Sequence, residues 1–165
     1  MFNALDLACY ISDEYFNKYN RKISNIKLQK ALYFLFAYWG GFIEKSKKSD
    51  AKVEQDMSHY QTELFTNDIE AWTYGPVIPD VFHQFEDYCG NQDNQTTEKK
   101  ISDKHGGFVK NFIDDVLRDL FPLSDFKLVD LSHDDNAWKN NYDENEMYHN
   151  NVIDKTSIIQ EYASK

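Results

Sequence analysis

The apolar positions of this chain recur mostly three and four residues apart, which is the spacing of one face of an α-helix. From Leu5 to Tyr19 they alternate with charged residues, and this predicts an amphipathic helix. Over 108–121 the spacing is the most regular in the chain, and Pro122 ends that helix because proline lacks the amide hydrogen that a helix needs. The isoleucines of 153–159 predict a closing helix. The pattern therefore predicts a mainly α protein.

The central element is predicted at Leu28–Ile43, where leucine and aromatic residues occupy every side of a helix. A helix that is apolar all round has to be covered by other elements, so we expect a helical bundle around this aromatic helix. Ser24 or Asn25 is placed to cap its start. The glycine pair at 40–41 predicts that the helix ends or loosens there, because each glycine costs about 1 kcal/mol relative to alanine.

One segment between the helices has the alternating pattern of a strand. It predicts a short β-strand or hairpin near 65–74. Gly75 and Pro76 are expected to break this segment and to start a helix, because proline suits the first helical turn. Ser132 and Asp135 have the spacing of a capping box, which predicts a further helix start near Ser132.

The connecting segments are polar. The pattern predicts a loop at 45–52 with a possible short helix over 53–64, and a surface loop at 91–104. Hydrophobic residues make up 41% of the chain and aromatic residues 16%, which is enough apolar surface for a folded core. We expect one domain over 1–165.

Charge narrows the class of partner. Eighteen basic and 28 acidic residues give a formal net charge of -10, which disfavours non-specific binding to nucleic acids. The same charge speeds the encounter with a basic protein, although it equally serves solubility alone.

Cys9 and Cys89 are far apart and lie beside apolar neighbours, so we expect two reduced, buried thiols rather than a disulfide. The first residues lack the features of a signal peptide, and the apolar run 31–43 is too short to span a bilayer. A cytoplasmic location is the prediction.

The residue types that carry out catalysis or bind metals lack the spacing that such sites need. The histidines and cysteines form no zinc motif, so neither a metal nor a cofactor is predicted. His133 beside Asp134 and Asp135 has the chemistry of a proton carrier or a cation ligand. The alternative, which we favour, is a helix start at which His133 makes a local hydrogen bond. The prediction is a protein without catalytic activity.

Some polar residues lie where the central helix has little room for them. Lys27, Gln29 and Lys30 are in its first turns, and a covered lysine there is expected to pair with a carboxylate such as Glu70. We expect these residues to pack near Glu70 and the turn at 72–76. Large aromatic residues elsewhere serve either the core or an interface, and these are Trp72, Tyr74 and Trp138.

Four segments together resemble a known family. They are Ser24–Phe34, which contains Lys-Leu-Gln-Lys, Ile69–Pro79, which contains Glu-Ala-Trp-Thr-Tyr-Gly-Pro-Val, Leu131–Trp138, and the closing helix. In order and spacing they resemble the Panacea domain, also called SocA-like. The second segment is the most specific, because it sets a tryptophan, a tyrosine, a glycine and two prolines at fixed spacing. Ala137 stands where the family usually has proline.

The resemblance implies an antitoxin in a bacterial or phage toxin–antitoxin system, which neutralises a partner toxin by blockade or by delivery to a protease. It implies no catalytic activity. The motif residues on which this interpretation rests are Lys27, Gln29, Lys30, Tyr33, Glu70, Trp72, Tyr74, Gly75, Pro76, His133 and Trp138.

Two other hypotheses remain open. The first is a phage or mobile-element inhibitor whose acidic surface blocks a basic nucleic-acid enzyme or a host defence protein. The second is a hydrolase centred on His133 and Asp134.

Overall fold

The computed structural model describes residues 1–48, 57, 59–91, 101–102, 107–145 and 151–165. Most of these residues are helical, and the described strands form a small antiparallel pair, so the predicted mainly α fold is confirmed. The elements are α1 (Ala4–Tyr19), α2 (Asn25–Lys48), β1 (Glu70–Trp72), β2 (Gly75–Val77), α3 (Pro79–Gly90), α5 (Phe108–Leu120), α6 (Asp125–His133), α7 (Asn136–Lys139) and α8 (Lys155–Ser164).

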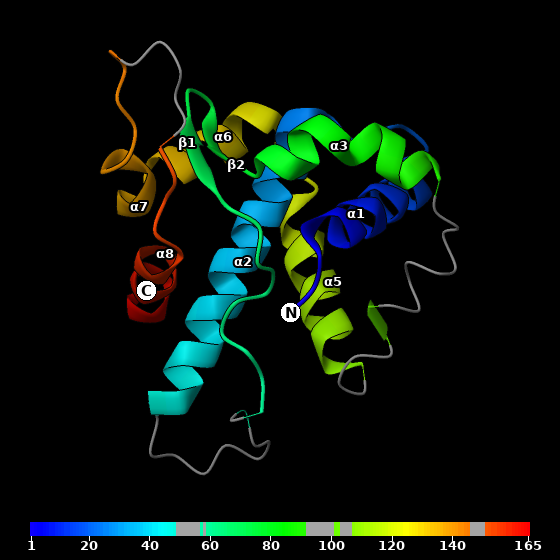
Figure 1. Ribbon diagram of the computed structural model, residues 1–165. Helices are drawn as coiled ribbons and strands as arrows, with labels where there is room; N and C mark the ends of the chain where they lie inside the picture. Colours follow the sequence, from blue (N-terminus) through cyan, green and yellow to red (C-terminus); the bar gives the residue numbers. More distant parts are fainter. Residues whose placement is uncertain (49–56, 58, 92–100, 103–106, 146–150) are drawn as a thin grey trace.

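Helix α2 runs through the middle of the molecule, as its sequence predicts (Figure 1). It packs against α8 on one side and against α1, α3 and α5 on the other, while the hairpin β1–β2 and α6 contact its N-terminal half. Every residue from Lys27 to Ala37 is buried. The backbone amide of Lys27 donates to Ser24 Oγ at 3.0 Å, so Ser24 caps the helix start.

The prediction that α2 ends at its glycine pair is wrong, because the helix continues to Lys48 and takes up the start of the predicted loop at 45–52. Packing explains why glycine is tolerated there. A Cβ atom on Gly41 would lie 2.7 Å from the backbone carbon of Tyr162, and one on Gly40 would lie 2.5 Å from Ile159 Cγ1. The two glycines therefore let α8 pack directly against the backbone of α2.

The predicted hairpin is present, but it extends further along the chain than expected. Glu70 pairs with Val77 and Trp72 pairs with Gly75, so residues 75–77 form a strand and the predicted helix begins only at Pro79. Gly75 has a φ of 91°, a backbone conformation that glycine adopts without strain. The other edge of β1 is also paired, because the amide of Ala71 donates to the carbonyl of Asn151 at 2.9 Å.

The predicted helix start near Ser132 is also wrong. Ser124 caps α6 by accepting from the amide of Lys127, and Ser132 lies buried in the last turn of that helix, where its hydroxyl donates to the carbonyl of Val129. Helix α7 starts after Asp135. Ser132 therefore lies at the end of a helix and not at the start of one.

Two predictions concern segments that lie partly outside the described residues. In the segment 53–64, the described residues 57 and 59–64 contain no helix. In the segment 91–104, Ile101 is fully buried, so this position is part of the core rather than of a surface loop.

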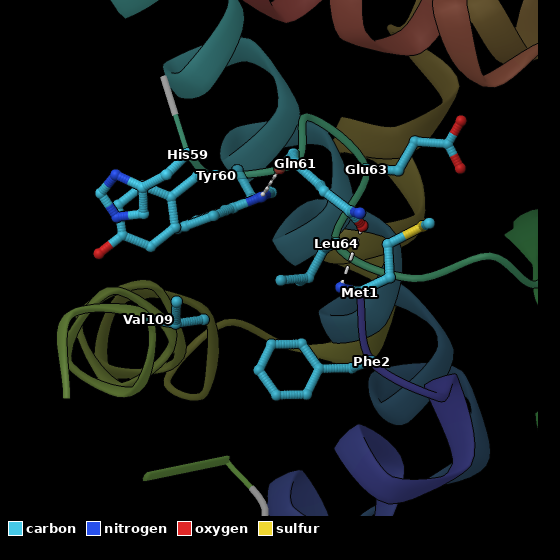
Figure 2. A pocket seen from close by; sticks show the side chains of 9 residues that line it. Met1, Phe2, His59, Tyr60, Gln61, Glu63, Leu64 and Val109 are labelled. Carbon is cyan, nitrogen blue, oxygen red and sulfur yellow. Dashed lines mark hydrogen bonds between the residues drawn. The ribbon is translucent and has the colours of Figure 1, made fainter. Parts of the chain in front are cut away.

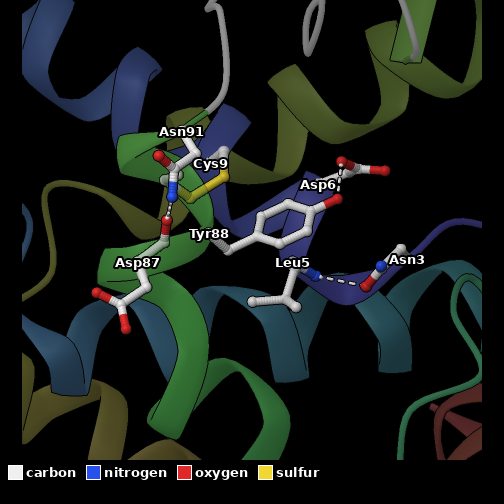
Figure 3. Close-up of a disulfide and its surroundings, with 8 residues drawn as sticks. Asn3, Leu5, Asp6, Cys9, Asp87, Tyr88 and Asn91 are labelled. Carbon is white, nitrogen blue, oxygen red and sulfur yellow. Dashed lines mark hydrogen bonds between the residues drawn. A yellow bond between two sulfur atoms is a disulfide. The ribbon is translucent and has the colours of Figure 1, made fainter.

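The expectation of two reduced thiols is wrong, because Cys9 and Cys89 form a disulfide (Figure 3). Helices α1 and α3 lie side by side and bring the two Cα atoms to 5.5 Å, within the range that a disulfide requires. Beside this bond, the Tyr88 hydroxyl donates to Asp6 at 2.9 Å. Helix α3 is therefore tied to α1 at its C-terminal end by a covalent bond and a hydrogen bond.

In the described part of the chain, we find no helix with the length and hydropathy needed to cross a membrane.

Replacing Gly41 tests the close contact between α2 and α8. We expect Gly41→Ala to lower the free energy of unfolding by about 1–3 kcal/mol, because the methyl group overpacks against the backbone of Tyr162. Gly90→Ala is the matched control, since nothing lies within 4 Å of its added Cβ. Denaturant titration of both variants measures the difference, and equal stability would contradict the contact.

Reduction tests the disulfide. Its 80-residue separation predicts that opening the bond lowers the free energy of unfolding by about 4 kcal/mol, because the unfolded chain loses a constraint. Thermal unfolding with and without dithiothreitol measures the effect. A Cys9→Ala/Cys89→Ala variant should have the same unfolding temperature in both buffers. A wild-type protein whose unfolding temperature does not change with dithiothreitol would contradict the disulfide.

Candidate functional site

The family motif residues gather where the start of α2 meets the hairpin and the α6–α7 turn. At the centre is Lys30, whose side chain is only 1% exposed and whose Nζ donates to the carbonyl of Pro76 at 2.8 Å. Burial lowers the pKa of Lys30 to about 7. Pairing with Glu70 was expected and does not occur, because Glu70 accepts from Trp72 Nε1 at 2.8 Å instead.

Gln29 fixes the junction between β2 and α3. Its Nε2 donates to the carbonyl of Ile78 at 3.3 Å, and its Oε1 accepts from the amide of Ile78 at 2.8 Å. Both backbone groups of Ile78, the residue before α3, are therefore satisfied by one buried side chain. Gln29 and Lys30 thus pack near the turn as expected.

Lys27 does not reach the hairpin, so the expectation for this residue is wrong. Its Nζ donates to the carbonyl of Phe121 at 3.0 Å and to that of Leu123, and it lies 3.9 Å from Asp125. Successive positions on a helix point in different directions, and residue 27 faces the α5–α6 turn. Lys27 therefore holds that turn against the start of α2.

Gly75 brings the hairpin directly onto this buried cluster. A Cβ atom there would lie 2.9 Å from Lys30 Cε and would also clash with Ser132 Oγ. Pro76 beside it is also buried. The motif glycine is thus explained both by its backbone conformation and by close approach.

A second buried group centres on Asp135, which the sequence suggested as a carboxylate beside His133 or as part of a capping box. Asp135 is 2% exposed and accepts from the hydroxyls of Tyr33 at 2.7 Å and Tyr162 at 2.8 Å, and from Lys165 Nζ at 2.6 Å. Burial and the nearby Asp135 carboxylate raise the pKa of both tyrosines. The signal for the hydrogen bond to Tyr33 is the tyrosine itself, because a tyrosine on a fully covered helix needs a partner for its hydroxyl.

Trp138 holds the hairpin from the other side. Its Nε1 donates to the carbonyl of Trp72 at 2.9 Å. Its ring stacks on those of His133 and Tyr142, with ring centroids 3.9 Å and 4.7 Å apart. His133 ends α6 and does not start a helix. Burial lowers the pKa of His133, and the Lys30 charge lowers it further, which favours a neutral ring stacked on the indole.

The exposed part of the cluster is aromatic. Tyr74, at the hairpin turn, is 58% exposed, and Phe82, on the first turns of α3, is 42% exposed. The Phe82 ring lies 5.0 Å from that of the half-buried Trp72. We call Trp72, Tyr74 and Phe82 the hairpin patch. Phe82 has the helical spacing of a core residue, but its side chain is largely exposed.

A cavity of about 140 Å³ lies near the N-terminus and is separate from the motif (Figure 2). The amino group of Met1 donates to Gln61 Oε1 at 3.2 Å, and Trp39 Nε1 donates to the carbonyl of Gln61 at 3.0 Å. Glu63, also in the lining, pairs with Lys155 at 2.6 Å. These contacts join the N-terminus, α2 and α8 to the segment that follows α2.

The described residues contain no group of three or more histidine, cysteine, aspartate or glutamate side chains placed to hold a metal ion. Fold and site therefore define a mainly α domain in which buried polar side chains hold an exposed aromatic hairpin. The chain belongs to the antitoxin SocA-like, Panacea domain family, whose model matches residues 53–139. That match contains the hairpin and the α6–α7 segment, whereas Ser24–Phe34 and the closing helix lie outside it. No curated protein and no solved structure matches the chain significantly.

The buried amine of Lys30 makes stability depend on pH. Between a folded pKa of about 7 and the usual value of 10.5, the unfolded chain holds a proton at this lysine that the folded protein has released. Raising the pH from 7 to 9.5 should therefore stabilise the fold, by up to about 1.4 kcal/mol per pH unit. Lys30→Met should lose this rise, and the exposed Lys45→Met should keep it. Denaturant titrations between pH 7 and 9.5 measure the free energy of unfolding. The same dependence on pH in the wild type and in Lys30→Met would contradict the prediction.

Proposed function

We propose that this protein is an antitoxin that neutralises a protein toxin by binding it through the hairpin patch. Family membership supports an antitoxin-like, non-catalytic role in general. The observation that favours this particular surface is the exposure of Tyr74 and Phe82 beside Trp72. Large aromatic side chains contribute much of the binding energy in protein interfaces, and exposing them is costly in a protein without a partner.

The base of the patch supports the same proposal. Lys30, Trp138 and Gln29 hold the hairpin and the start of α3 by hydrogen bonds to backbone atoms. A surface that is held in place before binding loses little conformational entropy when a partner docks. Tyr74 and Phe82 thus stand on a preorganised support.

The acidic charge favours a toxin with a basic surface, and a nucleic-acid enzyme is one class with that property. With a net charge of -10, the protein would meet such a toxin faster at low salt. A toxin of this class would also fit the hypothesis of an inhibitor whose acidic surface blocks a basic nucleic-acid enzyme. Delivery of the toxin to a protease is compatible with the same patch.

The same proposal covers the location of the protein and the extent of its domain. We propose one Panacea domain over 1–165 that acts in the cytoplasm of a bacterium, on a toxin encoded nearby by the chromosome or a phage. The Cys9–Cys89 disulfide weighs against the cytoplasm, because thiols are mostly kept reduced there.

Co-expression tests the antitoxin role. Each neighbouring gene product is expressed alone and with this protein, and we expect one to stop growth alone and to be neutralised by the wild type. If no neighbour behaves in this way, the antitoxin role is wrong.

The patch is tested with the same pair of proteins. We expect Tyr74→Ala/Phe82→Ala to weaken binding of the purified toxin roughly tenfold or more, because two interface aromatics are removed. Phe42→Ala is the control, since Phe42 is 38% exposed at the other end of α2. Circular dichroism verifies the fold of each variant. Wild-type affinity in the double variant would place the interface elsewhere and leave the antitoxin role intact.

A further inference from the structure

A groove of about 540 Å³ lies where the end of α1, the loop before α2 and the α5–α6 turn meet. Its floor is aromatic. The ring centroids of Tyr15 and Tyr19 are 4.7 Å apart, and those of Tyr15 and Phe121 are 5.1 Å apart. Lys27 holds the wall through the carbonyls of Phe121 and Leu123. The groove is therefore built from side chains that neighbouring elements already fix.

The rim of this groove is basic, in a protein whose net charge is -10. The Arg21 guanidinium lies 5.9 Å from the ring centroid of Tyr15 and 5.8 Å from that of Tyr19. Lys22 lines the same groove, and Lys18 Nζ lies 5.5 Å from the Tyr19 centroid. Arg21 and Lys22 are exposed and form no ion pair with a carboxylate of the described residues. Both charges are thus accessible to a ligand.

The one carboxylate in the groove lining is already engaged. Asp125 accepts from Ser24 Oγ at 2.6 Å and lies 3.9 Å from Lys27 Nζ. It therefore compensates the buried lysine at the groove wall and leaves Arg21 and Lys22 uncompensated.

We propose that this groove docks an acidic peptide segment of a partner protein. A large apolar side chain of the peptide packs on the partly exposed Tyr19, which the buried rings of Tyr15 and Phe121 support, and a neighbouring carboxylate pairs with Arg21 and Lys22. Charge complementarity favours this ligand, because a carboxylate meets two accessible cations above an apolar floor. A polyphosphate chain fits less well, because it has no apolar side chain to place against the aromatic rings.

This docking site is distinct from the hairpin patch. Helix α6 separates them: Asp125, at its first residue, lines the groove, and His133, at its last, lies by the hairpin. Its nine residues make the helix about 13 Å long. The proposal does not depend on the antitoxin role, and one partner is able to contact both surfaces.

Fluorescence anisotropy with the full-length protein tests the groove. The first probe is a short labelled peptide in which glutamates flank a phenylalanine, and its twin has glutamine at each glutamate. The third probe is a labelled oligothymidylate, which carries phosphates in place of carboxylates. We expect the glutamate peptide to bind best and to weaken at high salt, because its contact with the rim is electrostatic.

Two double variants distinguish binding in this groove from non-specific electrostatic attraction to the protein. Arg21→Gln/Lys22→Gln should weaken binding of the glutamate peptide at least about tenfold, as loss of interface cations does. Lys45→Gln/Lys48→Gln makes the same change in net charge at the end of α2 and should leave the affinity unchanged. No binding of the glutamate peptide, equal binding of its glutamine twin, tighter binding of the oligothymidylate, or full affinity in the Arg21/Lys22 variant would each overturn the proposal.

Discussion

Helix α2 is covered on nearly all sides, and this constraint decides how the surrounding segments are attached. Polar side chains in a covered helix need partners, because an unpaired buried polar group costs free energy. Lys27 finds its partners at the α5–α6 turn, Gln29 at the start of α3, Lys30 at the hairpin and Tyr33 at the α7 start. Four side chains of one helix thus position four segments around it, and the hairpin patch depends on two of these attachments.

Sequence patterns predicted the elements better than their contacts. The covering of α2, the hairpin and the approach of Lys30 to the turn followed from periodicity and from the cost of burying a lysine. The partners did not follow, because Pro76 lies 46 residues after Lys30, and Asp135 lies 102 residues after Tyr33. Local patterns show that a polar group needs a partner, and only the fold shows which partner it takes.

The wrong predictions have a similar cause. Glycine has a low helix propensity, yet the glycine pair is helical because the approach of α8 requires the absence of side chains. Phe82 has the spacing of a core residue, but its side chain is 42% exposed beside Trp72. Cys9 and Cys89 are 80 residues apart in the sequence, and only the packing of α1 on α3 brings them together. In each case tertiary packing overrides a local expectation.

The attachments around the hairpin end on backbone atoms rather than on side chains. Lys30 binds the carbonyl of Pro76, Gln29 binds both backbone groups of Ile78, and Trp138 binds the carbonyl of Trp72. Every residue type except proline offers both backbone groups, so these bonds place little demand on the side chains of the hairpin. These bonds hold the hairpin without engaging the side chain of Tyr74, which stays exposed. A hairpin that is held by its backbone keeps Tyr74 in one place and leaves its ring open to a partner, which is the preorganisation on which the proposed toxin contact relies.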